Sequence, residues 1–463
     1  MRHWLLIMSI MSGLVVGCGT PLEPPRPNDD SGEPGVKELF EEQLTILEAD
    51  RGNPEHWHKL AMAYHANQQI PLAIICYQQA IEAGLDTSQV HLMLGLANAE
   101  LAQDEAALAA FRKAVEVDPS DAEAKWRLAL ALLELGQAEQ ALQRLSSGTH
   151  DAGVVAVQHI RAQILIQLKR ESEAINGLRA WLTRKPGDLH AHYLLGVALR
   201  NQGKSETATP HLKAGVGTSP DRSGVQVVIQ EWARDTQSLR TKALRDLDNG
   251  SVDRAISQLK QLADDHPEDA TLVLNLGMAT VASGDMDSGK RYLEQSLDMN
   301  PELELAHRQL AGIELRGKNA DAARKNPQAI EAGIQHLRKA IAISPENSST
   351  QSLLGKALVL QGKNSEAIEF LLPSAQARPG DTQLTVNTIS LLLDLERYQE
   401  ALDLIEVLRV IRPDDPNPVI SAATAYAGLG DMDLARSLLQ MAGNRWPRHQ
   451  GIKRAMRTLE DTR

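Results

Sequence analysis

Few residues in this sequence have the types and spacing that catalysis or metal binding requires. Residues 284–291, GDMDSGKR, approach the spacing of a phosphate-binding loop. However, Arg291 stands where such a loop needs a Ser or Thr to bind magnesium, and no predicted strand precedes the segment. His190 and His192 are two residues apart in a predicted helix, so their side chains diverge and are poorly placed to share one metal ion. We therefore expect no enzyme active site, no metal site and no cofactor.

The N-terminal sequence MRHWLLIMSIMSGLVVGCG indicates export. It has a basic residue, Arg2, and then an apolar stretch over residues 5–16 that is too short to span a bilayer comfortably. The run LVVGC, which ends at Cys18, closely resembles the lipobox of bacterial lipoproteins. The resemblance implies a signal peptide at residues 1–17, cleavage before Cys18 and acyl chains that anchor the protein in a membrane. The alternative is an ordinary secretory peptide in which the cysteine occurs by chance.

Two residues near and beyond the lipobox refine this prediction. By resemblance to Gram-negative lipoproteins, Gly19 in place of Asp favours the outer membrane, with the protein facing the periplasm. The sequence has two cysteines, so a lipidated Cys18 leaves Cys76 without a partner for an intramolecular disulfide. Cys76 lies in an apolar predicted helix without an evident basic neighbour, which favours a small core residue over a nucleophile.

Residues 18–35 read as a linker, because they are rich in Pro, Gly and acidic residues. We expect this linker to be extended where the prolines cluster and disordered elsewhere, with a reach of roughly 50 Å at about 3 Å per residue. The whole chain has a formal net charge of -12, which argues against general nucleic-acid binding because that function needs a basic face.

A unit of about thirty-four residues, with two predicted helices, recurs after the linker. Early in its second helix each unit has a small residue, and four residues later a large apolar one. The small residues are Ala73, Ala107, Ala141, Ala174, Ala208, Ala255, Gly289, Gly333, Ala367, Ala401 and Ala435. The first helix also has a small residue in ten of the eleven units, and proline closes nine units. Small residues allow two helix backbones to approach closely, so each unit is predicted to be a tightly crossed helix pair.

This pattern resembles the tetratricopeptide repeat, and the first unit carries Trp57, Leu60, Ala61, Tyr64 and Ala73 at the signature places of that family. The resemblance implies an all-α, right-handed solenoid of about eleven helix pairs over residues 36–463, with a capping helix at each end. The predicted units are 54–87, 88–121, 122–154, 155–188, 189–222, 236–269, 270–303, 304–347, 348–381, 382–415 and 416–449. The thirteen extra residues at 223–235 are expected to lengthen the first helix of the sixth unit.

In this family the first helix of each unit lines a concave groove that holds ligands. Carried over to this sequence, the groove residues are Leu92, Leu96, Trp126, Leu130, His159, Tyr193, Val197, Leu274 and Met278. Such an apolar wall suits an amphipathic helix or an extended apolar peptide. The alternative is that superhelical curvature buries these side chains against neighbouring units.

The family also has a carboxylate clamp, in which basic and Asn residues of successive units bind the C-terminus of a peptide. Arg240, Asn275 and Arg308 fall at three of the matching places, while Leu244 and Gly312 depart from the pattern. A partial clamp could still bind an acidic group by charge-assisted hydrogen bonds. The alternative is that the three are ordinary solvated side chains.

These features predict a non-enzymatic, membrane-anchored scaffold that binds a protein or peptide partner in the bacterial cell envelope, with no nucleic acid and no small-molecule cofactor. One alternative is an assembly factor for an outer-membrane secretion, pilus or polysaccharide-export machine. Another is a regulatory partner of an envelope enzyme, such as a peptidoglycan synthase or a glycosyltransferase.

Overall fold

The computed structural model describes residues 23–27, 33–145, 155–219, 229, 231–317 and 326–461. The predicted signal peptide at 1–17 and the predicted lipidation site Cys18 lie outside the described residues, so both remain predictions.

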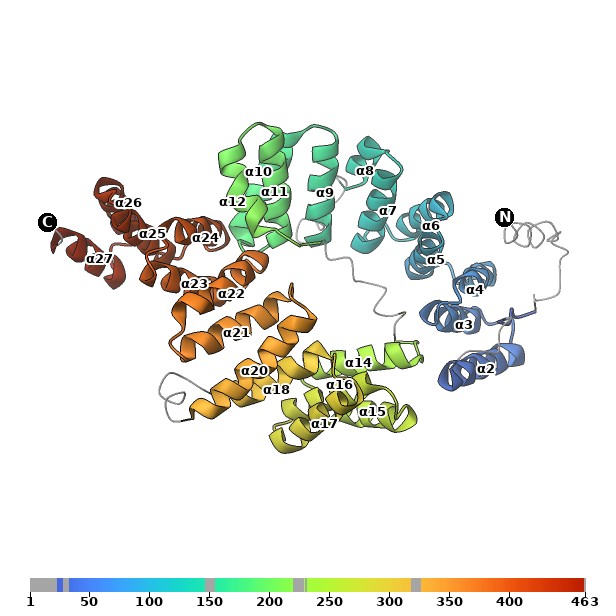
Figure 1. Ribbon diagram of the computed structural model, residues 1–463. Helices are drawn as coiled ribbons and strands as arrows, with labels where there is room; N and C mark the ends of the chain where they lie inside the picture. The colour runs from blue at the N-terminus through green and yellow to red at the C-terminus, as the bar shows by residue number, and fades with distance from the viewer. Residues whose placement is uncertain are drawn as a thin grey trace, which may run out of the picture. The chain divides into compact units, whose positions relative to one another are not determined.

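Every regular element in the described part of the chain is an α-helix, which confirms the predicted all-α fold of helix pairs (Figure 1). Eleven consecutive pairs lie between α2 and α27. The chain divides into two compact units, one of residues 1–124 and 223–238 and the other of residues 125–222 and 239–463. We call these unit 1 and unit 2.

Unit 1 contains the first helices. They are α2 (Pro34–Ala49), α3 (Pro54–Ala66), α4 (Ile70–Glu82), α5 (Ser88–Glu100) and α6 (Asp104–Val117). The next helix, α7 (Ala122–Glu134), begins in unit 1 and has most of its length in unit 2.

Unit 2 contains the remaining pairs. The first are α8 (Ala138–Leu145), α9 (Val155–Gln167), α10 (Glu171–Arg184), α11 (Leu189–Asn201) and α12 (Ser205–Ala214). Then follow α14 (Thr236–Asp248), which begins in unit 1 and has most of its length in unit 2, and α15 (Val252–Asp265), α16 (Ala270–Ala282), α17 (Met286–Met299), α18 (Glu304–Leu315) and α20 (Pro327–Ile343). The last are α21 (Ser348–Leu360), α22 (Asn364–Ala377), α23 (Thr382–Asp394), α24 (Tyr398–Ile411), α25 (Asn417–Gly428), α26 (Met432–Arg445) and α27 (Gln450–Asp461).

Small residues face large ones at the helix crossings, as the repeat pattern predicts. A Cβ added to Gly355 of α21 would lie 2.5 Å from Cγ of Leu371 on α22 and 3.0 Å from the backbone oxygen of Ala367. A Cβ on Gly196 of α11 would lie 2.7 Å from Cγ of Leu212 on α12. Because these contacts are shorter than van der Waals distance, a larger residue at either glycine would push the two helices apart.

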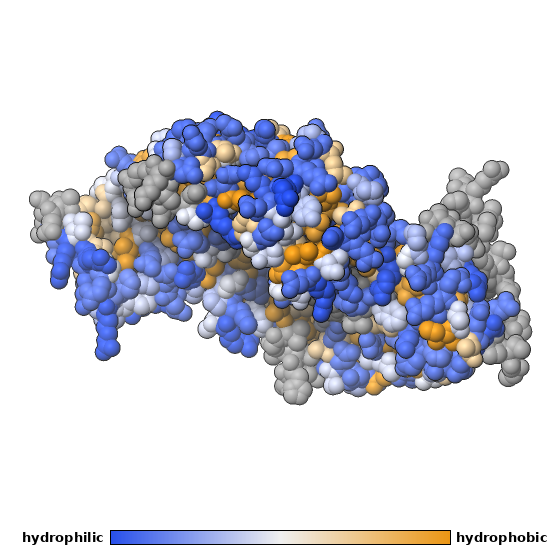
Figure 2. Space-filling model, turned by 90° about the horizontal axis from the view of Figure 1, so that it is seen from below, coloured by the Kyte–Doolittle hydropathy of each residue, from blue (hydrophilic) through white to orange (hydrophobic). Residues whose placement is uncertain are grey.

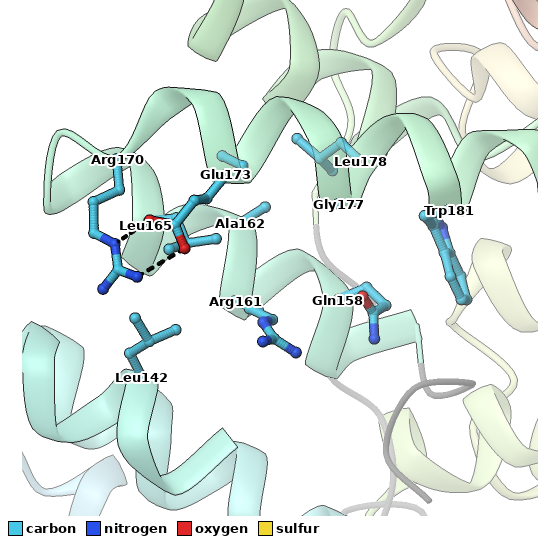
Figure 3. A pocket seen from close by; sticks show the side chains of 11 residues that line it. Leu142, Gln158, Arg161, Ala162, Leu165, Arg170, Glu173, Gly177, Leu178 and Trp181 are labelled. Atoms are coloured by element: carbon cyan, nitrogen blue, oxygen red, sulfur yellow. Dashed lines mark hydrogen bonds and ion pairs between the residues drawn. The ribbon is translucent and has the colours of Figure 1, made fainter. Parts of the chain in front are cut away.

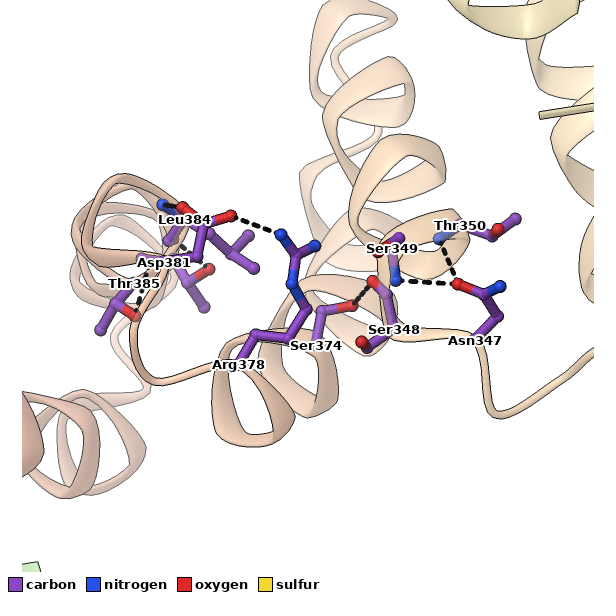
Figure 4. Close-up of polar contacts among 10 residues, drawn as sticks. Asn347, Ser348, Ser349, Thr350, Ser374, Arg378, Asp381, Leu384 and Thr385 are labelled. Atoms are coloured by element: carbon purple, nitrogen blue, oxygen red, sulfur yellow. Dashed lines mark hydrogen bonds and ion pairs between the residues drawn. The ribbon is translucent and has the colours of Figure 1, made fainter. Parts of the chain in front are cut away.

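Polar side chains start the first helix of many repeats. Asn347 Oδ1 accepts hydrogen bonds from the N–H groups of Ser349 (3.1 Å) and Thr350 (3.2 Å), and Asp381 Oδ1 accepts one from Leu384 N–H at 3.0 Å (Figure 4). The guanidinium of Arg378 pairs with the other oxygen of Asp381 at 3.0 Å. Such N-caps satisfy backbone donors that an α-helix leaves unpaired in its first turn.

The inserted residues before α14 do not lengthen that helix, so this prediction was wrong. Helix α14 begins at Thr236 and is 13 residues long, the same length as α3, α5 and α16. The residues before it pack within unit 1 instead, where Asn67 accepts from Arg234 N–H at 2.9 Å and donates to the backbone oxygen of Trp232 at 3.1 Å. Polar pairing with a side chain and backbone 165 residues away competes with helix extension.

Part of the predicted linker is ordered against unit 1. Residues 23–27 have no helical or strand structure, and the backbone oxygen of Pro25 accepts a hydrogen bond from the Tyr64 hydroxyl at 2.6 Å. This part of the linker is therefore docked on the folded chain.

Within unit 2, α12 contacts α24 although the two helices lie five repeats apart. Ala214, Val407 and Ile411 form one buried apolar cluster, against which Leu189 and Val410 pack. At the edge of this contact, Lys213 Nζ lies 3.7 Å from a carboxylate oxygen of Asp403.

The face shown in Figure 2 is mainly hydrophilic. The face shown in Figure 2 carries small, separate apolar patches among charged and polar side chains. In the described residues no helix combines the length and the apolar character needed to span a bilayer.

Candidate peptide-binding groove

Two predicted groove residues, His159 of α9 and Tyr193 of α11, come together through a third side chain. The rings of His159 and His190 meet edge to face with centroids 4.7 Å apart, and His190 stacks with Tyr193 at 6.0 Å. Tyr193 is 40% exposed, whereas His159 is buried. This row therefore offers one open aromatic face on a rigid, packed base, which suits a flat apolar group of a ligand.

Asp188, in the turn before α11, holds the base of this row in place. Its carboxylate accepts hydrogen bonds from Trp181 Nε1–H at 2.7 Å and from Ala191 N–H at 3.0 Å, and it lies 2.9 Å from His159 Nε2. Burial alone would raise the pKa of Asp188, but hydrogen bonds from His159, the Ala191 N–H and Trp181 hold it below the usual range. The charged carboxylate thus fixes α9, α10 and α11 relative to one another.

A pocket of about 220 Å³ lies between α8, α9 and α10 (Figure 3), and its lining includes Trp181, which donates to Asp188. Its apolar lining includes Leu142, Leu165 and Leu178. Gly177 leaves the space empty, because a Cβ at this position would meet no atom within 4 Å. The repeat is therefore able to accept an apolar side chain of a ligand here.

The charged rim of the pocket combines one fixed pair with one more exposed cation. Arg170 donates from Nε and Nη2 to the two carboxylate oxygens of Glu173 at 2.6 and 2.7 Å, so much of its charge is neutralised. Arg161 also lines the pocket and is exposed. A ligand with an acidic group next to its apolar side chain would complement this rim.

The comparisons with known proteins bear on what this arrangement is. The tetratricopeptide repeat family matches residues 58–116, 103–164 and 240–289. The chain is a tetratricopeptide-repeat protein. Tetratricopeptide repeats are typical of non-catalytic scaffolds that bind proteins or peptides.

Several solved structures are similar to the chain at low identity. PilF of Pseudomonas aeruginosa is 14% identical, with a TM-score of 0.36, over 47% of this chain and 95% of that chain. Yeast Tom70 is 13% identical, with a TM-score of 0.31, over 88% and 95%. YrrB, described as a TPR protein with an unusual peptide-binding site, is 14% identical, with a TM-score of 0.24, over 58% and 96%. Among curated proteins, none matches this sequence.

Burial divides the nine predicted groove residues of this tetratricopeptide-repeat protein into two groups. The buried ones, for which the packing alternative applies, are Leu92, Leu96, Trp126, His159 and Leu274, at 3%, 4%, 5%, 2% and 2% exposed. The half-buried ones are Leu130, Val197 and Met278, and Tyr193 is exposed. Ligand contact by the first group would require the repeats to move, so the accessible part of the predicted groove is the second group.

The partial carboxylate clamp is spread over three first helices of the tetratricopeptide repeats. Arg240 of α14 is half-buried, and Asn275 of α16 is buried at 3% exposed. Arg308 of α18 donates from Nη1 to Asn347 Oδ1 at 3.5 Å, and its Nε lies 3.9 Å from a carboxylate oxygen of Glu304. Because Arg308 already has a carboxylate neighbour, it is poorly prepared to bind a second one. Of the three, Arg240 remains the best placed to meet an anion.

Sequence reasoning missed His190 and Asp188 as parts of this site. The signal was present, since Asp188 follows a closing proline by two residues at the start of a predicted helix. His190 and His192 do have different neighbours, because His192 faces His211 while His190 faces His159 and Tyr193.

Cys76 is fully buried in α4, and burial raises the pKa of its thiol well above the usual range. This environment favours the core role predicted for it. Among the described residues, no group of three or more His, Cys, Asp or Glu side chains is arranged to hold a metal ion.

Proposed function

We propose that this tetratricopeptide-repeat protein is a lipoprotein anchored through Cys18 in the bacterial outer membrane, where it binds a protein or peptide partner in the envelope. The repeat family supports the binding role. The lipobox-like run LVVGC supports the anchor. The observation that carries the binding proposal is the exposed ring of Tyr193 on its packed base, and the pocket at Gly177 is a second apolar feature of unit 2.

The chemistry of this surface specifies the kind of segment that it would bind. Leu142, Leu165 and Leu178 would surround an apolar side chain, and Tyr193 would cover a second one. Arg161 would pair with an acidic residue between or beside them. We therefore infer a partner segment with two apolar anchors and at least one acidic residue.

Site-specific crosslinking in the host tests the binding role. A photoreactive aromatic residue replaces Tyr193 in one strain and Met441, which is 57% exposed on α26, in the control strain. We expect a discrete crosslinked partner from position 193 and none from position 441. Adding Gly177→Trp, which fills the pocket, should reduce the yield from position 193. An equal yield at both positions would exclude this surface as the binding site.

The anchor needs a separate experiment. Mass spectrometry of the mature protein should find cleavage before Cys18 and an acylated N-terminus, and membrane fractionation should find it with outer-membrane markers. A Cys18→Ala variant should remain unprocessed. Recovery of a chain that is intact from Met1 and free of membranes would refute the anchor and leave the binding role standing.

A further inference from the structure

A proline-rich segment lies on the surface of unit 1 that α2 and α3 provide. The segment is Glu23-Pro24-Pro25-Arg26-Pro27. Pro24 is buried, Pro25 and Pro27 are half-buried, and Glu23 and Arg26 are exposed. A short segment that forms no helix or strand of its own can bury a side chain only by packing on a specific surface.

The sequence of the segment sets its conformation before it docks. Each proline fixes its own φ, and each residue that precedes a proline is restricted to extended conformations. The segment is therefore biased to a polyproline II helix, which repeats every three residues and places Pro24 and Pro27 on one side. This bias lowers the entropy lost on binding, which is the reason that other domains recognise P-x-x-P segments on aromatic-lined grooves.

The segment contacts Tyr64, whose ring packs against that of Phe40. The Tyr64 hydroxyl donates to the backbone oxygen of Pro25 at 2.6 Å. Tyr64 is itself fully buried and packs edge to face against Phe40 of α2, with ring centroids 4.8 Å apart. Because this ring cannot move without disturbing the first repeat, its hydroxyl is a fixed donor that selects a carbonyl at one place along the segment.

Two acidic residues of α2 form ion pairs with Arg26. Arg26 Nη1 lies 3.1 Å from Glu41 Oε1, and Nη2 lies 2.9 Å from Glu48 Oε1. Glu41 and Glu48 are seven residues apart, which places both on one side of the helix, two turns from each other. The guanidinium bridges this gap with its planar fork, a geometry that lysine could not reproduce.

We propose that the α2–α3 surface of unit 1 is a recognition site for proline-rich segments of the form P-P-R-P, and that the chain's own residues 23–27 occupy it. The buried proline, the fixed tyrosine donor and the paired carboxylates each recognise a different feature of the segment. The site is separate from the Tyr193 surface and does not depend on lipid anchoring.

Occupation by the chain's own segment has two consequences. The segment is tethered close to α2, so its local concentration is in the millimolar range and a free peptide must displace it. The second consequence rests on the proposed anchor. If Cys18 carries the lipid, docking at Pro24 leaves a tether of roughly 20 Å instead of the 50 Å of a free linker.

Fluorescence anisotropy tests whether the segment docks through these contacts. The label is placed at Asn28→Cys in the full chain carrying Cys18→Ser, since Cys76 is buried. Arg26→Glu should lower the anisotropy, and adding Glu41→Arg with Glu48→Arg should restore it. The control is Glu42→Arg, which makes the same charge change at the neighbouring exposed residue of α2 and should leave the anisotropy unchanged. Unchanged anisotropy in Arg26→Glu would overturn the proposal.

Titration with a labelled peptide of residues 20–30 tests whether the surface is a binding site in its own right. The peptide should bind the full chain with Pro24→Gly and Arg26→Glu at least about tenfold more tightly than the unaltered chain, because its competitor has been disabled. Tyr64→Phe in that variant should weaken binding about threefold to tenfold, with circular dichroism confirming the fold. Equal affinity for both chains, or no binding up to about 5 mM, would overturn the proposal.

Discussion

Gly177 and Gly355 both lie inside helices, but their surroundings predict opposite effects of the same substitution. A Cβ at Gly177 meets nothing within 4 Å, so Gly177→Ala should stabilise α10 by about 0.5–1 kcal/mol through reduced chain entropy. At Gly355 the added Cβ meets Leu371 at 2.5 Å, so Gly355→Ala should destabilise the α21–α22 pair by about 1–3 kcal/mol.

The measurement for this pair should be local, because repeat arrays do not unfold as one cooperative unit. Amide hydrogen exchange should show slower exchange in α10 for Gly177→Ala and faster exchange in α21 and α22 for Gly355→Ala. A shift in the same direction for both variants would contradict the packing described here.

Asp188 should contribute to stability as a charged group. Asp188→Asn keeps the shape but weakens the hydrogen bonds from Trp181 and Ala191, so α10 and α11 should lose about 1.5–3 kcal/mol of protection at pH 7. The folded pKa lies below the unfolded one, so this contribution is present above about pH 3.9 and is lost as the pH falls toward the folded pKa.

Hydrogen exchange of α10 and α11 at pH 7 and pH 3.5 checks both the size of the Asp188 contribution to stability and the direction of its pH dependence. The difference between Asp188→Asn and the unaltered chain should narrow at pH 3.5. Asp433→Asn is the matched control, since Asp433 is fully exposed and its solvent-screened ion pair with Arg436 should contribute little to stability. A difference that grows at low pH would show that the carboxylate is not held in its charged form.

At the scale of elements, two helix pairs carry the same arrangement of imidazoles. His192 of α11 faces His211 of α12 with Nδ1 atoms 2.8 Å apart, and His307 of α18 faces His336 of α20 at 3.1 Å. His192 Nε2 donates to the backbone oxygen of Pro186, so its Nδ1 accepts the proton of His211. A proton added to His192 Nδ1 would place two donors against each other, and one added to His211 Nε2 would leave a buried positive charge beside His192.

This geometry predicts that α12 loses stability in mild acid. Burial, with the neighbouring His192 and Arg179, lowers the pKa of His211 to about 4. The stabilisation is therefore complete above the unfolded pKa of about 6.5 and is lost as the pH falls toward 4. Hydrogen exchange of α12 should show this loss, and His211→Gln should remove most of it. Helices α18 and α20 of the same variant serve as the internal control and should keep their own pH dependence.

The helix pairs themselves could be predicted from sequence because their information is local. The pairing of a small residue with a large one, such as Gly355 with Leu371, lies within one repeat. It predicts where the two helices of that repeat cross closely. Exposure of the groove residues could not be predicted in the same way. Leu92 and Tyr193 both come from first helices, yet one is buried and the other is exposed, because burial depends on the neighbouring repeat.

At the scale of the whole molecule, the unpredicted features are contacts between segments far apart in the chain. The hydroxyl of Tyr64 meets Pro25, and the side chain of Asn67 meets Trp232, but neither pairing has a period or a complementary motif in the sequence. The contact of Ala214 with Val407 and Ile411 is of the same kind. The last two contacts depend on the path of several repeats, to which every helix crossing contributes a small rotation.

The α12–α24 contact within unit 2 can be tested by placing a charge in it. Ala214 is fully buried between Val407 and Ile411, so Ala214→Arg would have to bury a guanidinium without a partner or separate the two helices. Because separation costs only a small apolar contact, we expect the helices to part. Hydrogen exchange should rise in α24 and at the end of α12 but stay unchanged in α21 and α22. The control is Lys213→Ala, which removes a half-exposed ion pair with Asp403 and should change exchange little. If Ala214→Arg leaves α24 as protected as before, the two helices do not form a stabilising contact in solution.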